Sequence, residues 1–81
     1  MNNIYYLASA KYGGKLKIVL SESCPPSYKK WFDRHGSTVG YWISSGKEAM
    51  DSLIIVDVAG EKIEIPWNCI KFCHVVRINN G

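Results

Sequence analysis

The 81-residue sequence contains no apolar run approaching the roughly 18 to 20 residues that a helix needs to cross a bilayer. Its first residues, Met1 to Tyr6, lack the basic region and the long apolar region of an export signal. Internal repeats, low-complexity tracts and domain linkers are also missing. The length of 81 residues fits a single domain over residues 1–81, and its strand-rich pattern predicts that this domain is β-rich. The absences predict no membrane partner and a cytoplasmic location.

No stretch of the sequence matches a motif that specifies a reaction. The glycine pair before Lys15 leads into a strand-like segment, so it lacks the helix that follows a phosphate-binding loop. Asp57, Glu61 and Glu64 cluster around a predicted hairpin among apolar residues, which is typical of a solvated strand face. We therefore expect a non-enzymatic protein with no catalytic residues and no cofactor.

Cysteine is scarce, and its three copies, Cys24, Cys69 and Cys73, include no C-x-x-C pair. In a chain without an export signal, an odd count predicts reduced thiols and not a disulfide framework. With His35 and His74 these side chains are enough for a zinc or thiol site, which is the least favoured alternative because Cys73 and His74 point to opposite faces of a strand. The favoured prediction is that the cysteines pack as small apolar side chains and that no metal is bound.

Apolar residues make up 47% of the chain and include three Trp, five Tyr and two Phe, which is ample for one compact core and excludes disorder. The formal net charge of +3 is unevenly distributed. Residues 1–47 carry seven basic and two acidic side chains, whereas residues 48–81 carry three basic and five acidic ones. A polyanion should therefore prefer the surface built by the first half.

Extended segments dominate the pattern. β-Branched residues crowd the segment from Ser52 to Val58, and a turn over Ala59 to Lys62 leads to a second strand in which Ile63 and Ile65 alternate with polar residues. Upstream, a strand from Ile4 to Ala8 reverses at the glycine pair 13–14. The strand that follows, residues 15–20, alternates charged and apolar side chains, with Lys15 and Lys17 on one face and Leu16, Ile18 and Leu20 on the core face.

One short helix is predicted over Tyr28 to His35, with Ser27 as its N-cap and Gly36 as its stop. The preceding prolines, Pro25 and Pro26, end the second strand. The helical spacing separates an aromatic face from a basic face. The aromatic face consists of Tyr28, Trp31, Phe32 and His35, and the opposite face consists of Lys29, Lys30, Asp33 and Arg34.

The remaining pattern predicts a strand from Thr38 to Ser44, then the hairpin, and then one irregular or 3₁₀ turn over residues 65–70. In the last strand, Ile70, Phe72, Val76 and Ile78 are expected to line one side, which they share with His74. The run from Glu61 to Phe72 resembles the late strand, single helical turn and closing strand of SH3-like and Sm-like small barrels. We therefore predict a mainly β fold, a small barrel or strongly curled antiparallel sheet of five to six strands with one short helix.

The aromatic residues divide into a predicted core set and a predicted exposed set. Alternation puts Tyr5 and Tyr6 on opposite faces, and likewise Tyr41 and Trp42, so at least one member of each pair is a candidate for an exposed anchor. The predicted core aromatics are Trp31, Phe32, Trp42, Trp67 and Phe72.

The basic residues of the first half suggest a docking surface, because three neighbouring elements can merge their cations beside exposed tyrosines. The leading hypothesis is a small binding protein that docks on a protein or nucleoprotein partner, in the manner of a phage or mobile-element inhibitor or adaptor. The alternative is a nucleic-acid-binding small barrel that uses the same surface. The candidate binding residues are Lys11, Tyr12, Lys15, Lys17, Lys29, Lys30 and Arg34.

Overall fold

The computed structural model describes residues 3–35 and 37–76, which form seven strands in two sheets with one α-helix. Sheet A has the strand order β3-β1-β2-β7, and sheet B has the order β4-β5-β6. The prediction of a mainly β, strongly curled sheet with one short helix is confirmed, and the sheets do not close into a barrel. The elements are β1 (Ile4–Ser9), β2 (Lys15–Leu20), α1 (Pro26–His35), β3 (Thr38–Val39), β4 (Tyr41–Ile43), η1 (Lys47–Ala49), β5 (Ser52–Val56), β6 (Lys62–Pro66), η2 (Trp67–Cys69) and β7 (Ile70–Val76).

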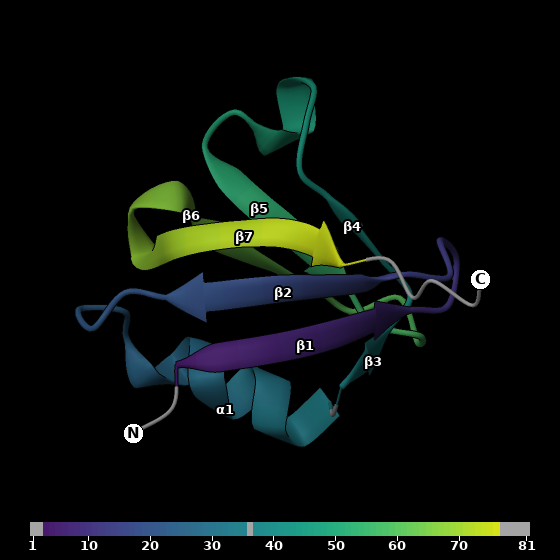
Figure 1. Cartoon of the computed structure of the whole chain (residues 1–81), viewed down its shortest axis with the longest axis horizontal. Coiled ribbons are helices and arrows are strands. Elements are labelled where there is room, and N and C mark those ends of the chain that lie inside the picture. Colours follow the sequence, from purple (N-terminus) through teal and green to yellow (C-terminus); the bar gives the residue numbers. More distant parts are fainter. Residues whose placement is uncertain (1–2, 36, 77–81) are drawn as a thin grey trace.

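The core lies between the two sheets and under α1. Figure 1 shows β7, β2 and β1 side by side, with sheet B behind them and α1 beside β1. Alternating residues of β2 point into this core, as their spacing predicts. Side chains of both sheets and of α1 contribute to it, among them Leu7, Leu16, Ile18, Leu20, Trp31, Phe32, Val39, Trp42, Leu53, Ile55 and Ile65. Within the described residues, no helix has the length and apolar character needed to cross a membrane.

A bend at Gly40 joins the two sheets. The predicted strand from Thr38 to Ser44 is divided there, so that β3 pairs with β1 in sheet A and β4 pairs with β5 in sheet B. The Gly40 N–H donates to the Val56 carbonyl at 2.7 Å, and its own carbonyl accepts from the Lys11 N–H at 3.0 Å. A Cβ at this position would lie 2.8 Å from the Asp57 carbonyl oxygen, so only glycine allows the two backbones to approach this closely.

Two details of the predicted sheet are wrong. The pairing of β1 with β3 is parallel, with Ala8 opposite Thr38, whereas the sequence predicts an antiparallel sheet. The reason is the chain path. β2 runs antiparallel to β1, and the segment containing α1 reverses the chain once more, so β3 runs in the same direction as β1. The strand predicted to reach Val58 ends at Val56 as β5, because the Asp57 carboxylate accepts backbone N–H groups of the following turn.

Helix α1 begins at Pro26, two residues earlier than predicted, so Ser27 lies in the first turn and is not the N-cap. Proline is well suited to this first position, since its fixed φ matches the helix and its missing N–H would have no partner there. The predicted aromatic face is confirmed. Trp31 and Phe32 are buried, and the Phe32 ring packs against Tyr5 of β1 with centroids 4.8 Å apart.

The largest difference from the predicted core lies in β7. Leu20 pairs with Ile70 and Val19 with Phe72, so Lys71 is the extra residue of a β-bulge. The bulge reverses the alternation, which turns Phe72 and His74 away from the core and leaves Phe72 46% exposed. The prediction that Phe72 is a core residue is therefore wrong, while Trp31, Phe32 and Trp42 are buried as predicted. Ile78 lies outside the described residues.

The short turn before β7 is confirmed as the 3₁₀ helix η2. Its first residue, Trp67, is partly buried against the core, and the indole N–H donates to the Ala49 carbonyl at 2.6 Å. This bond ties η2 to η1. The bond therefore holds the segment before β5 against the segment between β6 and β7.

We predict that Gly40→Ala destabilises the fold by roughly 1 to 3 kcal/mol, because the added methyl group meets the Asp57 and Val56 carbonyl oxygens at 2.8 and 3.2 Å. Chemical denaturation monitored by tryptophan fluorescence measures the change in the free energy of unfolding. Gly14→Ala is the matched control. Its Cβ would make ordinary contact with Val75 at 3.6 Å, so this variant should keep the wild-type stability or gain about 0.4 to 1 kcal/mol. Equal stabilities of the two variants would contradict the role assigned to Gly40.

Candidate interaction surface

The side of sheet A that faces away from the core forms a continuous surface across β1, β2 and β7. Because both pairings keep a regular register from Lys15 to Val19 of β2, its residues line up in cross-strand rows. We call this surface the outer face. Its three rows are Ile4, Val19 and Phe72; Tyr6, Lys17 and His74; and Ala8, Lys15 and Val76.

Lys17 lies at the centre of the outer face between two exposed aromatic rings. Its ammonium nitrogen is 5.8 Å from the ring centroid of Tyr6 and 5.7 Å from that of Phe72. The side chains of Phe72 and His74 are stacked, with centroids 5.1 Å apart and an interplanar angle of 16°. Cation–π attraction therefore holds Lys17 over the surface, with aromatic rings on both sides of it.

The outer face is positively charged. The strands β1, β2 and β7 contain Lys15, Lys17 and Lys71 and no Asp or Glu residue. Among residues 3–35 and 37–76, none of these lysines forms an ion pair. The positive potential of this surface is therefore not neutralised locally, as it would be in a salt-bridge network.

The structure brings only part of the predicted basic set together on this surface. Lys15 and Lys17 share the outer face. Lys11 and Tyr12 lie in the β1–β2 turn, where Lys11 lies over the Tyr41 ring at 5.1 Å and Tyr12 packs edge-on against Trp42 at 5.3 Å. These contacts connect the turn to β4 of sheet B.

The basic residues of α1 lie apart from the outer face. Lys30 and Arg34 line a shallow groove with Ile63 of β6, on the side of the helix that meets sheet B. Arg34 also forms an exposed ion pair with Glu61 at 3.2 Å. Lys29 belongs to the same helix, whose Trp31 and Phe32 are buried in the core between the two sheets. The seven predicted residues thus occupy the outer face, the β1–β2 turn and α1.

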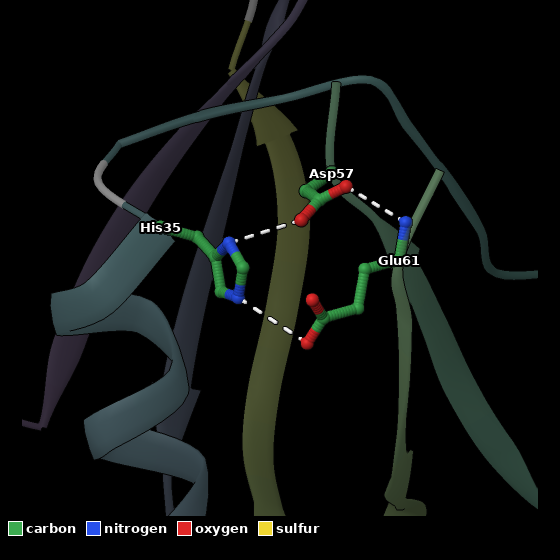
Figure 2. Close-up of side chains that lie close together, drawn as sticks. All are labelled: His35, Asp57 and Glu61. Atoms are coloured by element: carbon green, nitrogen blue, oxygen red, sulfur yellow. Dashed lines mark hydrogen bonds and ion pairs between the residues drawn. The ribbon is translucent and has the colours of Figure 1, made fainter. Parts of the chain in front are cut away.

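A second cluster joins the end of α1 to the β5–β6 turn (Figure 2). His35 Nδ1 lies 2.9 Å from an oxygen of the buried Asp57, and His35 Nε2 lies 3.5 Å from a Glu61 oxygen. The other Asp57 oxygen accepts the backbone N–H groups of Ala59 and Glu61 at 2.9 and 2.8 Å. The Arg34 Nε–H donates to His35 Nε2 at 3.3 Å, an arrangement that leaves the proton on Nδ1 to donate to Asp57.

These three side chains are the group of potential metal ligands found within the described residues, with ligand atoms no more than 4.8 Å apart. The hydrogen bonds of Asp57 are satisfied by protein groups, so we interpret the cluster as a structural tie between α1 and the hairpin. The ligands considered from the sequence, Cys24, Cys69, Cys73, His35 and His74, do not form such a group in the described part of the chain.

Cys24 is buried in a position unsuited to a nucleophile. Burial, together with the neighbouring Cys69, raises the pKa of Cys24 to about 11. Burial also raises the pKa of Cys73. Both thiols therefore stay protonated at neutral pH, and a protonated thiol is a poor nucleophile.

In comparisons with known proteins, no protein-family model, no curated protein and no solved structure matches the chain. A function for this protein has to be proposed from its own residues.

The sequence interpretation misses the two aromatic residues that β7 adds to the outer face. It assigns Phe72 to the core and considers His74 only as a metal ligand; no sequence signal marks the bulge at Lys71 that turns both outward. The expected exposed tyrosine of the first strand is Tyr6, which is 49% exposed. The interpretation of Asp57 as a solvated strand residue is wrong, because its carboxylate is buried against His35.

We predict that Asp57→Ala lowers the free energy of unfolding by at least about 2 kcal/mol, because it removes a carboxylate that accepts two backbone N–H groups and contacts His35. Thermal and chemical unfolding measure this loss. Glu61→Ala serves as the control and should cost less than about 1 kcal/mol, since its side chain is 54% exposed and its ion pair with Arg34 lies on the surface. A larger loss for Glu61→Ala than for Asp57→Ala would contradict this assignment.

The raised pKa of Cys24 predicts that this thiol resists alkylation in the folded protein. At about pH 8, iodoacetamide should leave Cys24 unmodified, because the reactive thiolate is scarce about three units below the pKa and the side chain is buried. Peptide mapping by mass spectrometry measures the modification, and the same reaction in denaturing urea is the control that should label all three cysteines. Rapid and selective labelling of Cys24 in the native protein would show that it is an activated thiol.

Proposed function

We propose that this protein is a non-enzymatic binding protein whose ligand is nucleic acid, bound on the outer face of sheet A. The observation that carries the proposal is the composition of that face. Three adjacent strands present lysines and exposed aromatic rings, with no carboxylate in any of them. Nucleic acids offer the complementary chemistry, a polyanionic backbone together with aromatic bases.

The electrostatic part of the proposal rests on Lys15 and Lys17. These residues are two apart on one strand, so their side chains emerge from the same face about 7 Å apart along the strand. Neither is engaged by a carboxylate among the described residues. A phosphate that approaches them therefore has no internal anion to displace, and the release of its counterions favours binding.

Nucleic acid is favoured over a protein partner because Lys15 and Lys17 lie on an open sheet surface and line none of the grooves at α1 and β6, on sheet B and between β1 and α1 that could hold an anchoring side chain. The groove between β1 and α1 reaches the edge of the outer face, where Ile4 and Tyr6 line it together with Asp33. Tight protein interfaces usually rely on such anchors, whereas a nucleic-acid site can be an open charged surface. Docking as a phage or mobile-element inhibitor or adaptor on a protein partner stays a prediction.

We predict that the Lys15→Gln/Lys17→Gln variant binds an oligonucleotide of about 16 nucleotides more weakly than the wild type, with a smaller salt dependence. Fluorescence anisotropy from about 50 to 200 mM salt gives the slope of log K against log salt, which should change by roughly 0.7 to 0.9 for each phosphate that the variant no longer neutralises. Labelled single-stranded and duplex DNA of one sequence are both tested.

The matched control is Lys29→Gln/Lys30→Gln, which removes the same charge from α1. It should bind like the wild type at equal salt, since long-range attraction changes equally in the two variants. Equal losses in both variants would mean that net charge and not the outer face determines binding. Failure of the wild type to bind either oligonucleotide at the lowest salt would contradict the proposed function and leave the protein-partner prediction.

A further inference from the structure

We infer that the outer face takes single-stranded nucleic acid, whose unpaired bases stack on Tyr6 and on the Phe72–His74 pair while the backbone passes Lys17 between them. This inference rests on the proposed function and adds to it the strandedness of the ligand and the part played by each side chain. Because an aromatic ring can stack on every base, this mode of binding does not depend on the nucleotide sequence.

The in-register pairing of the strands sets the spacing of this site. Tyr6 lies on β1 and Phe72 on β7, with β2 between them, so the two rings are separated by two strand spacings of about 4.8 Å and by one cross-strand row. Lys17 lies on β2, and its ammonium nitrogen is almost equally distant from both rings, at 5.8 and 5.7 Å. A chain that stacks one base on each ring must therefore carry its backbone past this ammonium group.

Part of each aromatic side chain is open to solvent, beside the Lys17 ammonium group that lies over both rings. Tyr6 is 49% exposed and Phe72 is 46% exposed, although one face of the Phe72 ring is covered by His74. A base placed on the open end of the Phe72–His74 pair extends a stack that already has an interplanar angle of 16°. Open sheet faces with exposed aromatic rings can stack two or three bases in this way.

The shape of a duplex keeps its bases from stacking on the outer face. In double-stranded DNA the base faces are stacked on each other, and the major groove, about 12 Å wide, admits a helix or a two-stranded ribbon. The outer face uses three adjacent strands, each about 4.8 Å from the next, and its rings lie on the two flanking strands. Only the phosphates of a duplex can reach this surface, and the aromatic rings then contribute little.

A second copy of this chain fits the outer face poorly. In a two-fold symmetric contact between two outer faces, Lys15 and Lys17 of each copy would meet a surface with the same positive charge and no carboxylate. Like charges brought together in this way oppose association. The charge of the outer face therefore favours a polyanionic ligand over self-association.

The test measures fluorescence anisotropy at one low salt concentration with single-stranded DNA, single-stranded RNA and duplex DNA of the same sequence. The variants Tyr6→Leu and Phe72→Leu remove one ring each but keep an apolar side chain, whereas Tyr6→Phe and Phe72→Tyr keep the ring. Both positions are exposed, and thermal unfolding checks that each variant is folded. Parallel measurements with DNA and RNA show which of the two single strands binds more tightly.

The inference predicts that a single strand binds more tightly than the duplex. Each leucine variant should lose about 5- to 150-fold in affinity for it, while the variants that keep the ring stay close to the wild type. Duplex binding equal to or tighter than single-strand binding would overturn the inference, as would leucine variants with unchanged affinity. If Lys15→Gln/Lys17→Gln still weakens binding in that case, the proposed function stands without stacking. If no oligonucleotide binds, both the proposed function and the inference are overturned. Both are also overturned if sedimentation shows a dimer that the leucine variants dissociate.

Discussion

Burial of one side of β2 determines what sheet A presents to solvent. Leu16, Ile18 and Leu20 are at most 1% exposed, and β2 lies between β1 and β7 in the sheet. Because side chains alternate along a strand, a slip of one residue in either pairing would move apolar residues to solvent and carry lysines into the core. The hydrophobic core therefore sets the register in which Tyr6, Lys17 and His74 meet on the opposite face.

The same core lies between the contacts that stabilise the fold and the surface that we propose for binding. Sheet B and α1 cover the inner side of sheet A, with Gly40 leading the chain from one sheet to the other and the contact between His35 and Asp57 fastening the end of α1. These contacts stabilise the fold without using any residue of the outer face. Substitutions on the outer face can therefore change binding while the fold keeps its stability.

Much of the fold is predictable because it depends on local patterns. The alternation in residues 15–20 assigns Lys15 and Lys17 to the solvent side, and the helical spacing of Trp31 and Phe32 identifies the buried face of α1. The remainder depends on contacts between distant segments. The bulge at Lys71 arises from the pairing of β7 with β2, and the burial of Asp57 requires the end of α1 to pack beside it. Alternation alone therefore predicts the lysines of the candidate site and misses Phe72 and His74.

The most direct test of the central claim is NMR chemical-shift mapping of the backbone amides during titration with a single-stranded oligonucleotide. The proposed site predicts shifts concentrated in β1, β2 and β7, with the largest changes near Tyr6, Lys17 and Phe72. Shifts confined to α1, around Lys29, Lys30 and Arg34, would contradict the claim that the outer face of sheet A is the binding surface.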